Sequence, residues 1–132
     1  MKVMLDTNIC IYIIKQRPSS VLDRLVALPS EDVGISVITV CELRYGASKS
    51  ARPERNHAAL DEFLSPFEIA LFDEPATRAY GGIRAAFEAK GRPIGPLDLL
   101  IAAHAVSLDA PLITNNAREF ERVPDLELDN WA

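Results

Sequence analysis

Three acidic residues of the 132-residue chain stand in surroundings that are unusual for a carboxylate. Asp6 directly follows a short apolar run, Glu42 lies on the apolar stripe of a helical segment, and Asp98 precedes the most apolar stretch of the chain. Burying a carboxylate is costly unless a metal ion or an arginine pairs with it. Each residue also has an ordinary alternative, as a turn or helix-cap residue for Asp6 and Asp98 and as a surface residue for Glu42. Taken together, they predict an acidic cluster assembled from three separate segments.

The residue types indicate which chemistry such a cluster would perform. Carboxylates without a partnering cysteine or histidine match the oxygen-rich coordination of Mg²⁺ or Mn²⁺ rather than that of Zn²⁺. A cation of this kind relieves the mutual repulsion of the carboxylates, polarises a phosphate and activates water. Thr114 and Asn116 follow a later apolar run much as Thr7 and Asn8 follow the first, and they supply further polar groups, although such residues also form ordinary turns. The sequence therefore predicts phosphoryl transfer to water.

The elements that must position these residues alternate between strand and helix patterns. Short apolar or β-branched runs predict strands at residues 2–5, 33–35, 67–72, 111–114 and, weakly, 126–128. Helical spacing begins at residue 9 and recurs over residues 18–28, 37–48, 52–64, 74–90 and 97–108. This order predicts an α/β fold, a three-layer α/β/α sandwich with a mainly parallel central sheet. Ligands of such sheets gather at the carboxyl ends of the strands, where Asp6 stands.

Composition narrows the class of protein. A hydrophobic content of 48% in 132 residues suits a single domain over residues 1–132 that folds without metal or disulfide staples. No apolar run approaches the roughly 20 residues of a membrane span, and the polar start of the chain argues against a secretory signal, so we expect a cytoplasmic protein. The net charge of −5 argues against a surface that coats nucleic acid as a whole but permits a local basic path.

The remaining cysteines and histidines favour structural roles. Cys10 and Cys41 lie in apolar segments and are interpreted as small hydrophobic residues, with no disulfide and no zinc site. We expect His57 to be exposed and His104 to pack inside the protein.

Four segments, residues 4–8, 36–46, 96–105 and 112–120, together resemble a known family. In this order and over nearly the whole chain, they are similar to the PIN-domain ribonucleases, and specifically to VapC-type toxins of bacterial toxin–antitoxin pairs. The resemblance implies cleavage of RNA, with structured RNA such as transfer RNA as the substrate, dependence on Mg²⁺ or Mn²⁺, and inhibition by a cognate antitoxin. It also implies a homodimer.

The resemblance assigns roles to individual residues. It makes Asp6, Glu42 and Asp98 the catalytic metal ligands. Asn116 matches a fourth position that is acidic in many PIN domains, and an amide there attracts a second divalent ion less strongly. We therefore expect one metal held chiefly by Asp6 and Asp98, with Glu42 binding it or orienting the attacking water and Asn116 completing the shell. Residues that resemble groups orienting the carboxylates are Thr7, Asn8 and Thr114.

Substrate binding is the least defined part of the sequence. Basic residues along the third predicted helix and beyond it, Arg44, Lys49 and Arg52, are candidates for contacting RNA, although a solvated helix face explains them equally.

Three other functions are alternatives to the nuclease. A receiver-type phosphoacceptor lacks the acidic pair that it needs near Asp6, and a haloacid-dehalogenase-like phosphatase lacks the second acid, because Asn8 stands in that place. The stronger alternative is a catalytically inactive PIN-like module that binds RNA or a protein, which the missing fourth acid permits. Metal-dependent cleavage of RNA distinguishes it from the nuclease.

Overall fold

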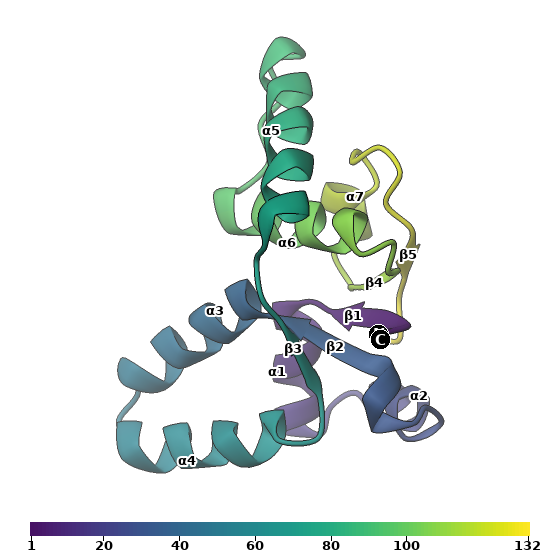
Figure 1. The fold of residues 1–132 in the computed structure, drawn as a ribbon. Coiled ribbons are helices and arrows are strands. Elements are labelled where there is room, and N and C mark those ends of the chain that lie inside the picture. Colours follow the sequence, from purple (N-terminus) through teal and green to yellow (C-terminus); the bar gives the residue numbers. More distant parts are fainter.

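The computed structural model describes residues 1–132 and contains one five-stranded sheet (Figure 1). The strands are β1 (Val3–Leu5), β2 (Val33–Ser36), β3 (Glu68–Ala70), β4 (Leu112–Ile113) and β5 (Leu128–Asp129). They lie in the order β3-β2-β1-β4-β5, and every neighbouring pair is parallel. The predicted parallel sheet is thus confirmed, and β1, the first strand of the chain, lies at its centre.

The helices agree closely with the predicted segments. They are α1 (Thr7–Lys15), α2 (Ser19–Val26), α3 (Val37–Ser48), α4 (Pro53–Leu64), α5 (Glu74–Ala89), α6 (Pro96–Ser107) and α7 (Ala117–Phe120), with one 3₁₀ turn, η1 (Ser30–Asp32). None of them combines the length and the apolar character that crossing a membrane requires. The short α7 is the helix that the sequence pattern did not predict.

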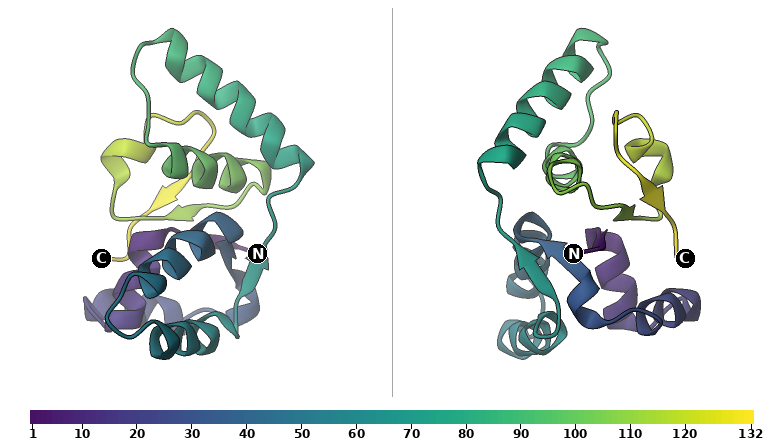
Figure 2. Two further views of the ribbon diagram at one scale, coloured as in Figure 1. Left: turned by 90° about the vertical axis from the view of Figure 1, so that its left-hand side faces the viewer. Right: turned by 45° about the vertical axis from the view of Figure 1, so that its right-hand side comes forward.

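Two hydrophobic cores, one on each face of the sheet, give the molecule its three layers (Figures 1 and 2). Successive side chains of a strand point to opposite faces. Met4 accordingly packs against α5 and α6, whereas its neighbour Leu5 packs against the helices of the other layer. Leu112 and Ile113 of β4 divide in the same way. The predicted α/β/α sandwich is confirmed.

The register of the sheet determines which residues reach its carboxyl edge. Leu5 is aligned with Ile35 of β2 and with Ile113 of β4. The residues that follow these three therefore lie at the same carboxyl edge of the sheet. Asp6, which follows Leu5, stands there between the residues that follow Ile35 and Ile113. The left view of Figure 2 looks onto this edge, with α1, α3, α6 and α7 around it.

Two local expectations, and the alternative role of Asp98 as a helix cap, differ from the structure. Cys41 is exposed rather than packed inside, whereas Cys10 is buried, and both are free thiols. His57 is half-buried rather than exposed, because α4 packs it against α3. Asp98 does not cap α6, since Gly95 is the N-cap and the helix begins at Pro96.

Candidate active site

Asp6 is fixed where β1 passes into α1. It is the N-cap of α1, and its Oδ1 accepts a hydrogen bond from the Ile9 amide at 2.9 Å. Its own amide donates to the Ile113 carbonyl at 3.0 Å, which ties this residue to β4. The residue is only 4% exposed. The cap and the strand pairing therefore hold a carboxylate almost out of contact with water.

The surroundings of Asp6 disfavour its negative charge. Burial raises its pKa from 3.8 to about 6, against the opposing hydrogen bonds from Thr114 and Ile9. The charges of Asp98 and Glu42 raise it further. Asp98 and Glu42 thus lie near enough for their charges to act on Asp6. A cation brought to these carboxylates would relieve both the burial and the repulsion.

Glu42 is positioned by α3 and held by α1. The helix begins directly after β2, where Ser36 is the N-cap and its Oγ accepts from the Ile38 amide at 3.1 Å. About one and a half turns of α3 then bring Glu42 to this edge, where it is half-buried. The Thr7 hydroxyl donates to Glu42 Oε1 at 2.6 Å and lies 3.3 Å from the Thr39 hydroxyl. This contact fixes one carboxylate oxygen and leaves the other available.

Asp98 enters from the opposite layer, in the first turn of α6. It is half-buried, and burial is the main reason that its pKa is raised, followed by the charges of Glu42 and Glu119. Glu119 belongs to α7 and was not among the predicted site residues. It lies one helical turn beyond Asn116, the N-cap of that helix, so the spacing of three residues was the available signal.

The polar residues after β1 and β4 differ in what they contact. Thr114 is buried, hydrogen-bonds to the Asp6 carboxyl group and accepts from the Asn116 amide at 2.9 Å. Asn116 is half-buried at the start of α7. Asn8 is exposed, and its side chain makes no hydrogen bond within the chain. Of the three predicted orienting residues, Thr7 and Thr114 touch the carboxylates.

The donor set fits a hard divalent cation, although no three His, Cys, Asp or Glu side chains come together closely enough to hold one between them. Every candidate donor is an oxygen, as Mg²⁺ and Mn²⁺ prefer. Asp6 supplies the buried negative charge that such an ion compensates.

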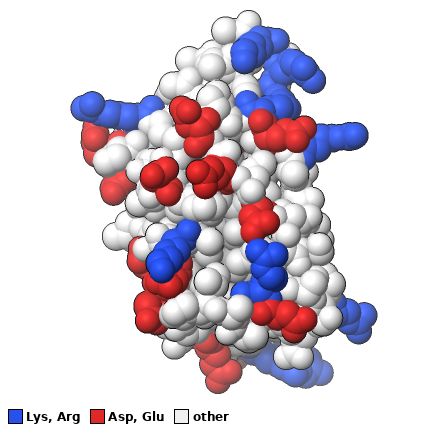
Figure 3. All heavy atoms as spheres, turned by 90° about the vertical axis from the view of Figure 1, so that its right-hand side faces the viewer, with Lys and Arg blue, Asp and Glu red and all other residues white.

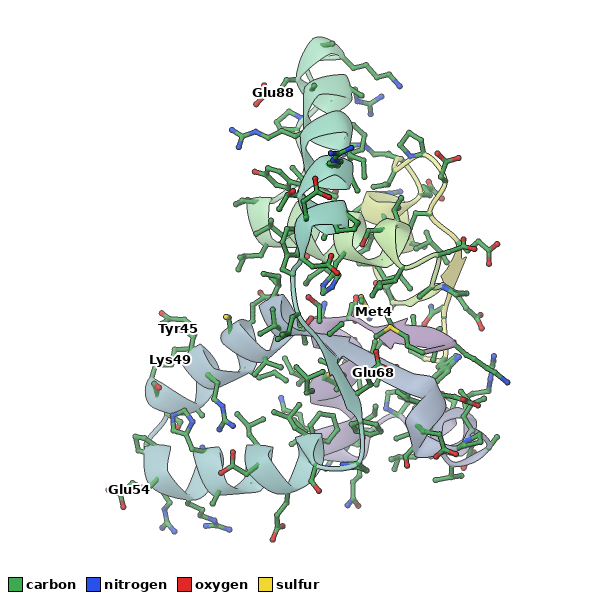
Figure 4. The ribbon with its side chains drawn as sticks, in the orientation of Figure 1. Met4, Tyr45, Lys49, Glu54, Glu68 and Glu88 are labelled. Carbon is green, nitrogen blue, oxygen red and sulfur yellow. The ribbon has the colours of Figure 1, made fainter.

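Two of the three predicted RNA-binding side chains contact other residues of the chain, and the third is exposed. Arg44 forms an ion pair with Asp61 of α4 and donates to the His57 carbonyl at 3.2 Å. Lys49 lies over the Tyr45 ring, 4.8 Å from its centre, on the outer part of α3 (Figure 4). Arg52 is exposed just before α4.

An apolar groove adjoins the site on the side of α1, α3 and α4. It encloses about 310 Å³, and Glu42 stands among its lining residues. Its apolar lining consists of small and branched side chains, Ile11, Ile14, Leu43, Ala47, Ala59 and Leu60.

Comparison with known proteins gives the family of this chain. The PIN domain family matches residues 3–126. Ribonuclease VapC2 of Rickettsia felis is 48% identical over 97% of this chain and 96% of its own length. The tRNA(fMet)-specific endonuclease VapC of Shigella flexneri is 46% identical and covers 100% of this chain and 99% of its own length.

Solved structures give the same result for the fold. The VapBC2 complex of Rickettsia felis, bound to a DNA fragment from its promoter, contains a chain that superposes with a TM-score of 0.92 at 46% identity, with both chains covered completely. The DNA-bound VapBC complex of Salmonella typhimurium matches with a TM-score of 0.94 at 45% identity, over 100% of this chain and 99% of that one. This chain therefore belongs to the PIN-domain family, within its group of VapC ribonucleases.

Proposed function

We propose that this protein is an endoribonuclease toxin that hydrolyses RNA phosphodiester bonds with the help of Mg²⁺ or Mn²⁺ and is neutralised by a cognate antitoxin. The observation that carries the proposal is the buried Asp6 carboxylate, which lies within electrostatic reach of Glu42 and Asp98. The relative from Shigella flexneri is named a tRNA(fMet)-specific endonuclease, which supports transfer RNA as the substrate class. We place this activity in the cytoplasm.

Asp6 and Asp98 would hold the cation, with Glu42 and Asn116 beside it. When bound, a divalent ion polarises the phosphate and lowers the pKa of water. Glu119 adds a carboxylate near Asp98, so the acidic character that Asn116 lacks is supplied one turn further along α7. The site thereby keeps four acidic side chains.

The protein's own groups orient the reaction. The Thr114 hydroxyl and the Ile9 amide fix the Asp6 carboxylate, and the Thr7 hydroxyl fixes Glu42 Oε1. Glu42 Oε2 is then free to accept a hydrogen bond from the attacking water, which turns the lone pair of the water toward the phosphorus. The mechanism requires no side chain as nucleophile, since water attacks directly.

Substituting Asp6→Asn tests the assignment. The variant keeps the size of the side chain and an oxygen for the Ile9 amide, and we expect Mg²⁺-dependent cleavage of transfer RNA to fall about 100-fold or more. Asp23→Asn, an exposed carboxylate on α2, is the matched control and retains full activity. Full activity of the Asp6→Asn variant would refute the site. A wild-type protein that binds RNA but never cuts it would instead support the non-catalytic module.

We propose that an apolar segment of the antitoxin binds in the apolar groove beside Glu42. A segment bound there would lie against Glu42 and obstruct the path to the carboxylates. The related VapBC structures are toxin–antitoxin complexes, which supports such a partner. Ile14→Glu places a charge in the groove and should abolish neutralisation by the product of the neighbouring small reading frame. Val26→Glu, at an exposed position on α2 outside the groove, should leave neutralisation intact.

A homodimer forms part of the same proposal. The apolar side chains of Tyr45, Leu71 and Leu97 are exposed outside the groove and offer surface to a second copy. Sedimentation velocity measures the assembly directly, and a monomer at micromolar concentration would contradict it.

A further inference from the structure

A polar pocket lies between α7 and the loop that follows α5. It encloses about 560 Å³ and has no hydrophobic residue in its lining. Three arginines face two glutamates there, namely Arg92, Arg118, Arg122, Glu119 and Glu121. The left view of Figure 2 shows α7 and this loop beside the start of α6, the helix that carries Asp98.

The guanidinium of Arg122 is occupied by contacts within the protein, and these contacts hold the walls of the pocket together. Its guanidinium donates to the carbonyl oxygens of Arg92 and Pro93, lies 3.7 Å from a Glu119 carboxylate oxygen, and stacks 5.1 Å from the centre of the Phe87 ring. These contacts fasten the end of α7 to the loop after α5. The backbone segments that carry Arg92 and Arg118 are therefore fixed relative to each other.

Arg92 and Arg118 are the available charges of the pocket. Both are exposed, and neither guanidinium forms a hydrogen bond or an ion pair within the chain. Arg44, which the sequence suggested as a contact for RNA, differs from them because its guanidinium forms an ion pair with Asp61. A guanidinium presents paired donors that match two oxygens of one phosphate, and it loses less hydration than an ammonium does when it binds.

The pocket lies beside the helix that carries one of the proposed metal ligands. Glu119, one of its lining residues, belongs to α7, and α7 lies next to the start of α6, where Asp98 stands in the first turn (Figure 2). A polyanion held at this edge must overcome the carboxylates and the net charge of −5, so it needs a local positive anchor. The face opposite this edge carries both acidic and basic side chains (Figure 3).

We infer that Arg92 and Arg118 bind a backbone phosphate of the RNA substrate next to the phosphate that is cut. The inference rests on the proposed nuclease function and adds the direction in which the RNA leaves the site, toward α7 rather than along α4. The purely polar lining suits a hydrated phosphate, whereas the apolar groove on the other side of the carboxylates suits a protein segment.

The test compares Arg92→Gln, Arg118→Gln and the double variant on two substrates, transfer RNA and a dinucleotide that has only the scissile phosphate. We expect KM for transfer RNA to rise about tenfold in the double variant and cleavage of the dinucleotide to stay unchanged. The slope of log binding constant against log salt concentration should fall by about 1 for each arginine removed. Arg122→Gln is not used as a test, because it would remove the contacts that join α7 to the loop after α5.

Two further variants make the result decisive. Arg55→Gln, at the start of α4, reports on the rival path, and Arg78→Gln, on the exposed side of α5, controls for the loss of one positive charge. An unchanged KM and salt slope in the double variant, or a loss confined to Arg55→Gln, overturns the inference. Loss of neutralisation by the antitoxin with unaltered RNA binding also overturns it, since the pocket then serves a protein. A wild-type protein that cuts neither substrate refutes the nuclease function, while the salt slopes still decide the role of the arginines.

Discussion

Removing the charge of Asp6 should make the protein more stable, even though it destroys the proposed activity. The folded protein holds the proton of this carboxyl group more tightly than the unfolded chain does, because its pKa is raised from 3.8 to about 6 by burial and by its acidic neighbours. Ionisation therefore costs folding free energy. The cost begins as the pH rises above 3.8 and is complete above about 6.

The size of the effect follows from the pKa difference. One pKa unit corresponds to about 1.4 kcal/mol, so the ionised carboxylate destabilises the metal-free protein by roughly 3 kcal/mol at pH 8. Asparagine is nearly the same size and still accepts from the Ile9 amide. We expect Asp6→Asn to raise the free energy of unfolding by about 2–3 kcal/mol at pH 8, which is roughly 8–12 °C in Tm for a chain of this length.

The assay is urea unfolding of the wild type and the variant in EDTA between pH 4 and pH 8. Taking the difference between the two proteins at each pH cancels the other titrating groups, and this difference should vanish near pH 4 and reach a plateau above pH 6. Asp23→Asn should show no such pH-dependent gain. Equal stabilities at pH 8, or a gain of constant size across the pH range, would show that the surroundings of Asp6 do not disfavour its negative charge.

Other predictions concern the metal, the orienting hydroxyl and the junction of β2 with α3. At about 100 times its Kd, Mg²⁺ should stabilise the wild type by roughly 2.7 kcal/mol and leave Asp6→Asn almost unchanged, which thermal melts would measure. Thr7→Val removes the donor to Glu42 and should lower kcat about 10–100-fold with little change in KM. Ser36→Ala loses the cap of α3 and the contact to His104 Nδ1 at 2.7 Å, and chemical denaturation should show a loss of about 1–3 kcal/mol. Burial lowers the pKa of His104 from 6.5, so the wild type should lose stability as the pH falls below 6.5, and His104→Gln should lose less.

The sequence predicted the carboxylate group because each member stands at a recognisable junction. Asp6 directly follows a strand, and Asp98 begins an apolar helix. Glu42 breaks an apolar stripe. All three patterns are local, and the alternation of strands and helices predicts that the three residues meet at one edge of the sheet.

The features that the sequence did not predict depend on short elements or on packing between helices. Glu119 lies on α7, whose four residues are too few to show a helical period. Cys41 is exposed because α3 turns that side outward, and the partners of Arg44 lie on α4. Such facts depend on how two helices meet, which the periodicity of either helix alone does not specify.

The order of the strands has a consequence for biosynthesis. Asp6 and Glu42 emerge early from the ribosome, but β4 pairs with β1, and the residues that follow it complete the site. A growing chain therefore lacks Thr114, Asn116 and Glu119 until translation has passed them, and docking of β4 must close a loop of most of the polypeptide. We therefore expect an unfinished chain to lack the proposed active site, because the residues after β4 are among the last to be made.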